Sequence, residues 1–259
     1  MAAEGKFKRY KTLLTKFDNW PSFLFFKLFG GDSFEFKMKN GFKLNVKKQM
    51  LPPFKENFFD EVYLQGFDEL KFDKDEPTII DIGGNVGFFS LFMFSKFSNA
   101  KIYTFEPMPF NFGQLNSYNE EFSNYDWTVE NKAVAKDDSG TTLYAATLDD
   151  FATMPTIRAD FGRTKTINVE TISLDQIVTK YEMAEIDLLK FDCEGSEYNI
   201  MYNASEESLG KIKTMTIETH LVDDESGNHQ ALLKFIKEKG FKTRDEEVKS
   251  DSGYIWAWR

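Results

Sequence analysis

Short apolar runs alternate with amphipathic segments from about residue 71 to the end of the chain. Apolar runs of about four to eight residues between glycine or polar turns are typical of strands, and the longer segments between them have the pattern of helices. We expect strands at 78–82, 101–105, 127–134, 141–146, 186–191, 211–218, 241–247 and 253–258. We expect helices at 88–97, 109–122, 173–181, 196–202 and 229–239. This alternation predicts an α/β fold in which helices cover both faces of a mostly parallel sheet.

The last two strands, 241–247 and 253–258, follow each other without a helix between them. Two strands joined by a short connection run antiparallel, whereas a parallel pair needs a long crossover. We therefore expect one antiparallel edge strand in the otherwise parallel sheet.

The part of the chain before the first expected strand of the main domain, 78–82, has a different pattern. Alternating residues on both sides of Asn40-Gly41 predict a hairpin over 34–46, because Asn-Gly is a strong signal for a tight turn. Pro52 and Pro53 follow as a break, and 56–66 has a helical pattern. We therefore divide the chain into an N-terminal helical and hairpin cap, 1–70, and a main domain, 71–259.

The first 30 residues are rich in aromatic and basic side chains. They hold six Lys and Arg against two Asp and Glu, a net +4 in a chain of −10. We expect a helical cap whose aromatic stripe packs on the main domain. A membrane-surface helix or a partner-binding segment has a similar composition, and we favour the cap over both.

Composition argues against several classes of protein. The chain has 259 residues, 32 Lys and Arg, 42 Asp and Glu, and a pI near 4.9, so we expect no nucleic-acid partner. Its longest apolar cluster, 20–31, is interrupted by Pro21 and Lys27 and is shorter than the roughly 20 residues that span a bilayer. We expect no integral membrane segment.

Cysteine usage and the start of the chain bear on its compartment. The single cysteine, Cys193, excludes an internal disulfide and a multi-cysteine zinc site, and it fits a reducing compartment. Basic residues near the start leave no apolar core of a signal peptide. We expect a cytoplasmic protein, and a homo-oligomer is compatible with the sequence.

A glycine turn follows the first predicted strand of the main domain. The residues Asp81-Ile82-Gly83-Gly84-Asn85-Val86-Gly87 lie where a parallel strand turns into a helix, the place where ligands bind in open α/β sheets. Glu106 ends the next strand, 19 residues after Gly87, in a position to accept hydrogen bonds from ribose hydroxyls. Together these features indicate a cofactor that contains a nucleoside.

The spacing of this turn favours S-adenosylmethionine over a dinucleotide. It lacks the Gly-x-Gly-x-x-Gly pattern of dinucleotide sites, and no Gly-Lys-Ser/Thr follows to make a P-loop. The Asp81 carboxylate would repel a pyrophosphate but suits a cationic ligand. S-adenosylmethionine carries an ammonium and a sulfonium and no phosphate, so Asp81 is expected to contact its amino-acid end, directly or through water.

Several ordered motifs resemble one family. They are Ile79 to Ser90, Phe105-Glu106-Pro107-Met108-Pro109, Asn131-Lys132-Ala133-Val134, Ser173-Leu174-Asp175 and Asp187 to Glu197. Over about residues 56–222 the chain is similar to the FkbM-type methyltransferases. The resemblance implies a Rossmann-like class I methyltransferase fold with a mostly parallel seven-stranded sheet. It implies an O-methyltransferase (enzyme class 2.1.1) that uses S-adenosylmethionine on a hydroxyl of a small molecule or sugar.

The resemblance also implies roles for individual residues. Asp81, Gly83, Asn85 and Gly87 would surround the methionine part, Glu106 would hold the ribose, and Asn131 and Ala133 would flank the adenine. Gly84, Phe88 and Pro107 complete the expected cofactor-binding set, with Asp192 and Glu194 beside the sulfonium. Gly84 replaces a commoner alanine, a change that we expect to leave binding undisturbed.

On the acceptor side the expected catalytic residues are His220, Asp192 and Glu194. An alcohol acceptor needs a base, and a histidine with its ordinary pKa near ~6.5 suits that role, so we favour His220 over Asp192 as the base. A purely structural role for His220 is the open alternative. Asp192, Glu194, Glu218 and His220 would also form a divalent-metal site, but we expect strand-end acids to serve the cofactor, and no metal. The other histidine, His229, is expected to lie at the surface or to cap a helix.

Two functional questions stay open at this stage. The polar connection 147–166, with Arg158 and Arg163, has the length of a substrate lid but also of a plain surface excursion. A nicotinamide-dependent oxidoreductase and a non-catalytic methyltransferase-like module are the alternatives to the methyltransferase. The missing dinucleotide pattern argues against the first, and the intact ligand-facing acids argue against the second.

Overall fold

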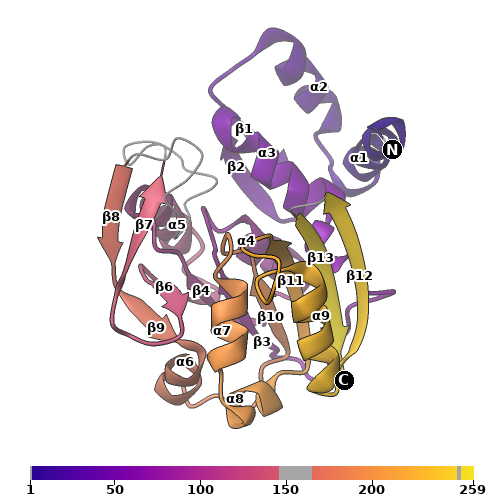
Figure 1. The fold of residues 1–259 in the computed structure, drawn as a ribbon. Coiled ribbons are helices and arrows are strands. Elements are labelled where there is room, and N and C mark those ends of the chain that lie inside the picture. Colours follow the sequence, from indigo (N-terminus) through magenta and orange to yellow (C-terminus); the bar gives the residue numbers. More distant parts are fainter. Residues whose placement is uncertain (1, 146–164, 250–251) are drawn as a thin grey trace.

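A computed structural model describes residues 2–145, 165–249 and 252–259. Its centre is a seven-stranded sheet in the order β12-β13-β11-β10-β3-β4-β5 (Figure 1). The strands are β3 (Thr78–Ile82), β4 (Lys101–Phe105), β5 (Asp126–Glu130), β10 (Leu188–Phe191), β11 (Thr214–His220), β12 (Lys242–Lys249) and β13 (Ser252–Trp258). This mostly parallel α/β sheet confirms the expected fold class.

The antiparallel strand differs from the prediction in its place. β13 runs antiparallel to both β11 and β12, so it lies between them and is not the edge strand. The edge strand is β12, which points in the same direction as β11. Because β12 and β13 form a hairpin, the returning strand β13 inserts between β11 and its own predecessor.

Helices cover both faces of the sheet (Figure 1). They are α4 (Phe88–Lys96), α5 (Pro109–Glu121), α6 (Leu174–Lys180), α7 (Glu197–Asn203), α8 (Glu206–Lys211) and α9 (His229–Glu238). Successive strand residues point to opposite faces. Ile79 and Leu188 accordingly join the apolar cluster of α4 and α5, whereas Ile80 and Leu189 join that of α6, α7 and α9.

Two small sheets lie beside the main one. β6 (Ala133–Ala135) pairs in parallel with β9 (Thr171–Ser173), and β7 (Thr141–Ala145) pairs antiparallel with β8 (Lys165–Val169). The single strand expected at 127–134 is therefore two strands: β5 ends its pairing in the main sheet at Glu130, and β6 pairs with β9 instead. The connection 147–166, with Arg158 and Arg163, lies almost wholly outside the described residues; only its last two residues belong to β8.

The N-terminal part contains helices and one hairpin. Helices α1 (Ala2–Lys16) and α2 (Trp20–Phe29) precede the hairpin of β1 (Ser33–Lys37) and β2 (Lys43–Lys47). The hairpin turns at Asn40-Gly41 as expected, with Phe36 opposite Leu44. Short helical turns follow: η1 (Lys48–Met50), α3 (Leu51–Lys55), η2 (Glu56–Asp60) and η3 (Val62–Leu64).

Pro52 and Pro53 do not break the chain; they begin a helix. They occupy the first turn of α3, where a missing N–H costs nothing because those donors have no partner within the helix. The helix expected over 56–66 is instead a π-helical turn and a 3₁₀ turn, separated at Glu61, whose φ is +54°. A left-handed residue cannot continue a right-handed helix.

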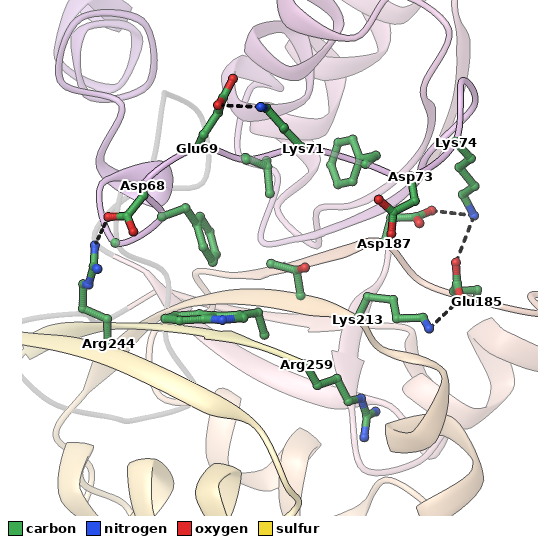
Figure 2. A pocket seen from close by; sticks show the side chains of 16 residues that line it. Asp68, Glu69, Lys71, Asp73, Lys74, Glu185, Asp187, Lys213, Arg244 and Arg259 are labelled. Carbon is green, nitrogen blue, oxygen red and sulfur yellow. Dashed lines mark hydrogen bonds and ion pairs between the residues drawn. The ribbon is translucent and has the colours of Figure 1, made fainter.

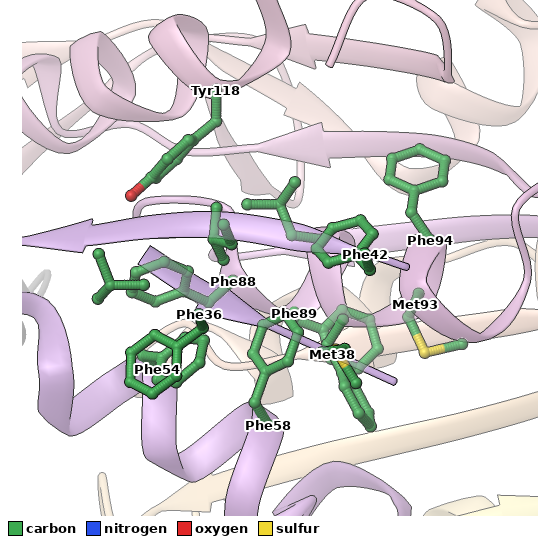
Figure 3. Packing of buried hydrophobic residues seen from close by; sticks show 14 of the residues in the cluster. Phe36, Met38, Phe42, Phe54, Phe58, Phe88, Phe89, Met93, Phe94 and Tyr118 are labelled. Atoms are coloured by element: carbon green, nitrogen blue, oxygen red, sulfur yellow. The ribbon is translucent and has the colours of Figure 1, made fainter. Parts of the chain in front are cut away.

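An aromatic cluster joins the N-terminal part to helix α4 (Figure 3). The rings of Phe36 and Phe54 stack with centroids 4.2 Å apart, those of Phe54 and Phe58 are 4.7 Å apart, and Phe58 meets Phe92 of α4 edge to face at 5.4 Å. The cap and the main domain thus share one buried cluster. The division at residue 70 stays a prediction.

No helix within the described ranges is long and apolar enough to cross a membrane.

Candidate functional site

The glycine turn after β3 touches the loop after β10. Gly83 has φ +75°, and a Cβ on it would lie 1.8 Å from the Asp192 carbonyl oxygen. A Cβ on Gly84 would lie 2.1 Å from Cγ2 of the buried Thr104. Only glycine allows both approaches. The alanine that the family resemblance implies for position 84 would therefore clash with Thr104, a neighbour that the sequence pattern did not reveal.

Asp81 is fully buried and paired with a lysine from the adjacent strand. Its Oδ1 lies 3.1 Å from Lys190 Nζ, and its Oδ2 accepts a hydrogen bond of 2.8 Å from Ser90 of α4. Lys190 Nζ also donates to the Gly83 carbonyl at 2.7 Å. Burial alone would lower the pKa of Lys190, but the charges of Asp81 and Asp192 raise it. Lys190 therefore stays charged and fastens the glycine turn to Asp81.

Glu106 connects the turns that follow β3 and β4. Its Oε2 accepts from the Asn85 backbone at 2.8 Å and its Oε1 from the Met108 backbone at 2.9 Å. Burial raises the pKa of Glu106 to about 7, against these two hydrogen bonds, which lower it. Asn85 Oδ1 is buried and has no hydrogen-bond partner among the described residues. The turn thus presents an acceptor that a donor on a ligand would satisfy.

The other residues of the expected cofactor set lie around this turn to different degrees. Asn131 Nδ2 donates to the carbonyls of Glu106 and Pro107 at 2.8 and 3.0 Å, so these three residues are brought together. Ala133 lies two residues further on, in the separate sheet of β6 and β9. Gly87 caps the N-terminus of α4.

Phe88 begins α4, but its side chain lies in the core. Its ring contacts Phe54 and Tyr118, with centroids 5.7 and 5.9 Å away, and 2% of the residue is exposed. The Phe88 side chain thus packs in the core. Only the Phe88 backbone is left for the predicted contact with the cofactor.

Acidic side chains gather beyond the ends of β10 and β11. The Tyr63 hydroxyl, from η3, lies 2.8 Å from Asp192 Oδ2 and 3.1 Å from Glu218 Oε2. Burial, and then the charge of Asp192, raises the pKa of Glu218 to about 8 and that of Glu56 to about 7. The cap therefore contributes Tyr63 and Glu56 to a carboxylate-rich group built on the main sheet.

His220 ends β11 and is held by two carboxylates. Glu197, at the start of α7 and fully buried, accepts a hydrogen bond of 2.7 Å from the His220 backbone N–H, and the same Oε1 lies 3.3 Å from His220 Nδ1. Glu194 Oε2 lies 3.8 Å from His220 Nε2. Burial alone would lower the pKa of His220, but Glu197, Glu194 and Asp192 raise it to about 10. The imidazole is thus protonated at neutral pH, so the expectation of an ordinary pKa near ~6.5 for His220 was wrong, because its neighbours are carboxylates.

Asp192, Glu218 and His220 also have the spacing of a metal site. Each offers one ligand atom, and the three atoms lie within 4.8 Å of one another. The Tyr63 hydroxyl, however, already bridges the two carboxylates. The arrangement is compatible with a divalent cation and equally with a polar acceptor site.

Four contributors were not assigned from the sequence: Lys190, Glu197, Tyr63 and Glu56. Lys190 carried the clearest signal, because a lysine in the apolar run Leu188–Phe191 must find a buried partner. Glu197 is the last residue of the motif Asp187 to Glu197, which supports the family resemblance, but the sequence indicated no role for it. Tyr63 and Glu56 lie in the cap, and no local pattern connects them to the site. His229, expected at the surface or as a helix cap, is the partly buried first residue of α9, after the N-cap Asn228; its ring lies between Thr219 and Asp245, at 2.9 and 3.3 Å.

A separate cavity of about 570 Å³ lies at the opposite, amino-terminal edge of the sheet (Figure 2). It is lined by Asp187 before β10, Thr214 at the start of β11 and Trp258 at the end of β13. Many of its charged groups form ion pairs, such as Arg244–Asp68 and Lys74–Asp187. It lies away from the glycine turn, and ligands in this architecture bind at the carboxyl ends of the strands.

Comparison with known proteins identifies the family. The family described as the methyltransferase FkbM domain matches residues 81–243. "Methyltransferase sdnD" of Sordaria araneosa is 27% identical over 225 residues, covering 74% of this chain and 82% of that protein. "31-O-demethyl-FK506 methyltransferase FkbM" of Streptomyces tacrolimicus is 26% identical over 209 residues, covering 70% and 78%.

A solved structure supports the fold. The crystal structure of methyltransferase FkbM from Methylobacillus flagellatus KT has a TM-score of 0.50 and 13% identity, covering 80% of this chain and about half, 54%, of that one. The fold is therefore that of the class I methyltransferases. Taken with the match over 81–243, the comparisons assign the chain to the FkbM methyltransferase family, and the protein is a methyltransferase.

Proposed function

We propose that this protein transfers a methyl group from S-adenosylmethionine to a hydroxyl group of a small molecule or sugar. The observation that carries the proposal is the contact between the two halves of the site. The glycine turn that follows β3 contacts the loop of Asp192, which follows the neighbouring strand β10. His220 ends β11, the strand on the other side of β10. A donor group held by the turn would lie beside the acidic group that receives an acceptor.

The residues of the turn fit this cofactor. Asn85 Oδ1, buried and unpaired among the described residues, suits an ammonium donor. Glu106 is fixed by two backbone N–H groups, and each carboxylate oxygen has a further lone pair for a ribose hydroxyl. Asp81 is occupied by Lys190, so its contact with an ammonium group would run through water or through the turn. When bound, S-adenosylmethionine supplies an activated methyl group on a positively charged sulfur.

On the acceptor side we assign proton removal to His220. Glu197 orients its ring, and Nε2 lies on the side of Glu194 and the acidic group. With a pKa of about 10 in the free protein, most His220 is protonated at neutral pH. A positive charge placed beside Asp192 would lower that pKa. The deprotonated fraction is then a strong base, and Asp192 and Glu194 orient the hydroxyl.

Ligand-induced stabilisation tests the cofactor. S-adenosylhomocysteine at about 100 times its Kd should stabilise the fold by about 2.7 kcal/mol, which corresponds to roughly 5–11 °C in Tm. NAD should have little effect. A clear shift with NAD and none with S-adenosylhomocysteine would contradict the proposal.

A matched pair of variants tests the site of binding. Glu106→Gln removes the charge from the expected hydrogen bonds to the ribose, a loss of about 1.5–3 kcal/mol in all, so affinity should fall about 10- to 150-fold. Glu120→Gln, at an exposed position of α5, should leave affinity unchanged. Equal affinities of the two variants in calorimetric titration would remove Glu106 from the cofactor site. Screening sugars and hydroxylated metabolites with labelled S-adenosylmethionine would then identify the acceptor.

A further inference from the structure

Exposed apolar side chains are concentrated on the first two helices. On α2, Phe25, Leu28 and Phe29 are 61%, 80% and 71% exposed, and on α1, Tyr10 and Leu14 are about half exposed. The rings of Phe25 and Phe29 lie 4.1 Å apart. Only three other large apolar side chains of the described residues are comparably exposed, and they belong to separate segments: Phe110 to α5, Leu221 to the loop after β11 and Val248 to β12. The first two helices thus carry an apolar patch.

Basic side chains lie beside this patch. Lys27 Nζ lies 3.5 Å from the Tyr10 hydroxyl and 5.4 Å from the centre of its ring, so it links the two helices. Lys39 Nζ donates to the Leu14 carbonyl at 3.2 Å. Burial, and then the charges of Lys27 and Arg9, lowers the pKa of Lys55. Cations therefore lie at Tyr10 and Leu14 of the patch, and Lys27, Arg9 and Lys55 are close enough to affect one another.

The charge of the chain is strongly divided. Residues 1–55 hold twelve Lys and Arg against four Asp and Glu, a net +8, which leaves −18 for residues 56–259. Helix α2 lies at the outer end of the cap, away from the main sheet (Figure 1). A basic segment whose exposed tip is apolar and aromatic has the composition of an interfacial membrane helix. With 10 residues, about 15 Å, α2 is too short to cross a bilayer.

We propose that α1 and α2 dock this enzyme on an anionic lipid surface, with Phe25, Leu28 and Phe29 in the interface and Lys11 and Lys27 among the headgroups. A second copy of the chain is a poorer occupant. Pairing of two patches about a two-fold axis would bring their lysines together, and like charges repel. An anionic bilayer satisfies both the apolar tip and the cations around it.

Sedimentation with lipid vesicles tests the proposal. The full-length protein should bind vesicles of phosphatidylcholine with about one third phosphatidylserine at low salt. It should bind pure phosphatidylcholine weakly and be released by about 0.5 M salt. Replacement of Lys11 and Lys27 by alanine should weaken binding by about 25-fold, since each basic residue contributes about fivefold. The triple change Phe25→Ser, Leu28→Ser, Phe29→Ser should weaken it at least tenfold.

Matched variants control for general effects of charge and apolarity. Lys234→Ala with Lys237→Ala removes two exposed lysines of α9, and Val248→Ser removes an exposed apolar side chain of β12. These should bind as the unaltered protein does, and all variants should keep its circular dichroism and Tm.

Three results would overturn the proposal. One is absence of binding to the anionic vesicles at low salt. Another is binding that the patch variants and the controls retain equally. The third is a combination of two observations: the unaltered protein does not bind vesicles, and the triple variant of the patch has a different oligomeric mass in light scattering. The patch would then join copies of the chain.

Discussion

The Glu197 carboxylate holds His220 at two points, the backbone N–H at 2.7 Å and Nδ1 at 3.3 Å. Its other oxygen accepts from the Gly195 N–H at 2.9 Å, in the loop that carries Asp192 and Glu194. One buried side chain therefore fixes the ends of both β10 and β11. Any base at His220 depends on this carboxylate for its orientation and its proton affinity.

Replacement of Glu197 by glutamine should shift the pH dependence of turnover. His220 must lose its proton to act as a base, so the rate should rise with pH up to an apparent pKa at or below about 10. Removal of the Glu197 charge destabilises the imidazolium, so this rise should move to lower pH by a unit or more. The plateau rate should fall about 10- to 100-fold, because the base is weaker and less well oriented.

Two variants make this measurement specific. Glu206→Gln, an exposed acid of α8, should leave the pH profile unchanged. Glu197→Asp keeps the charge and should restore part of the profile. A profile that is flat above about pH 6 in the unaltered protein would instead point to Asp192 as the base.

Chelation separates the metal and acceptor interpretations of Asp192, Glu218 and His220. Because the Tyr63 hydroxyl bridges the two carboxylates and His220 is paired with Glu197, we expect turnover to survive EDTA. Tyr63→Phe should raise the KM for the acceptor more than the Kd for the cofactor. Loss of activity in EDTA that returns with Mg²⁺ or Mn²⁺ would show that the three residues hold a metal.

Gly84→Ala should destabilise the fold, although the family resemblance implies that alanine suits this position. The new methyl group would lie 2.1 Å from Cγ2 of buried Thr104, and overpacking costs about 1–3 kcal/mol. Thr104→Ser removes that methyl and keeps the hydroxyl, which is 2.8 Å from Trp127 Nε1. The double variant should therefore recover most of the loss in denaturant unfolding, and additive losses would exclude this contact as the cause.

The sheet was predictable from the sequence because its strands are local patterns. The apolar runs at 78–82 and 101–105 correspond to β3 and β4, and Asn40-Gly41 marked its hairpin. The order of β12 and β13 was not predictable, since no local pattern says which of the two strands pairs with β11. β8, β9 and α8 were missed because they have only five, three and six residues, so their patterns are weak.

The site was predictable only where its residues form one motif. The turn of Gly83 and Asn85 and the acid Glu106 follow their strands directly, and the structure brings them together. Glu197 and His220 are 23 residues apart, and Tyr63 is 129 residues from Asp192. Such contacts are set by sheet register and by packing of the cap, which no local spacing encodes.

The buried pair of Asp81 and Lys190 provides the last test. The two residues are direct neighbours in the register of β3 and β10, with 0% and 2% exposure, and the amine also holds the glycine turn through the Gly83 carbonyl. Lys190→Met leaves the Asp81 carboxylate buried without its cation, so unfolding free energy should fall by about 3–5 kcal/mol. Asp81→Asn should cost less, because Asp192 Oδ2, 3.9 Å from the amine, still compensates the lysine. The double variant buries no unpaired charge of this pair and should be more stable than Lys190→Met alone. If the two losses simply added in chemical denaturation, the charges would not be coupled, and the role of Lys190 would reduce to its hydrogen bond with the turn.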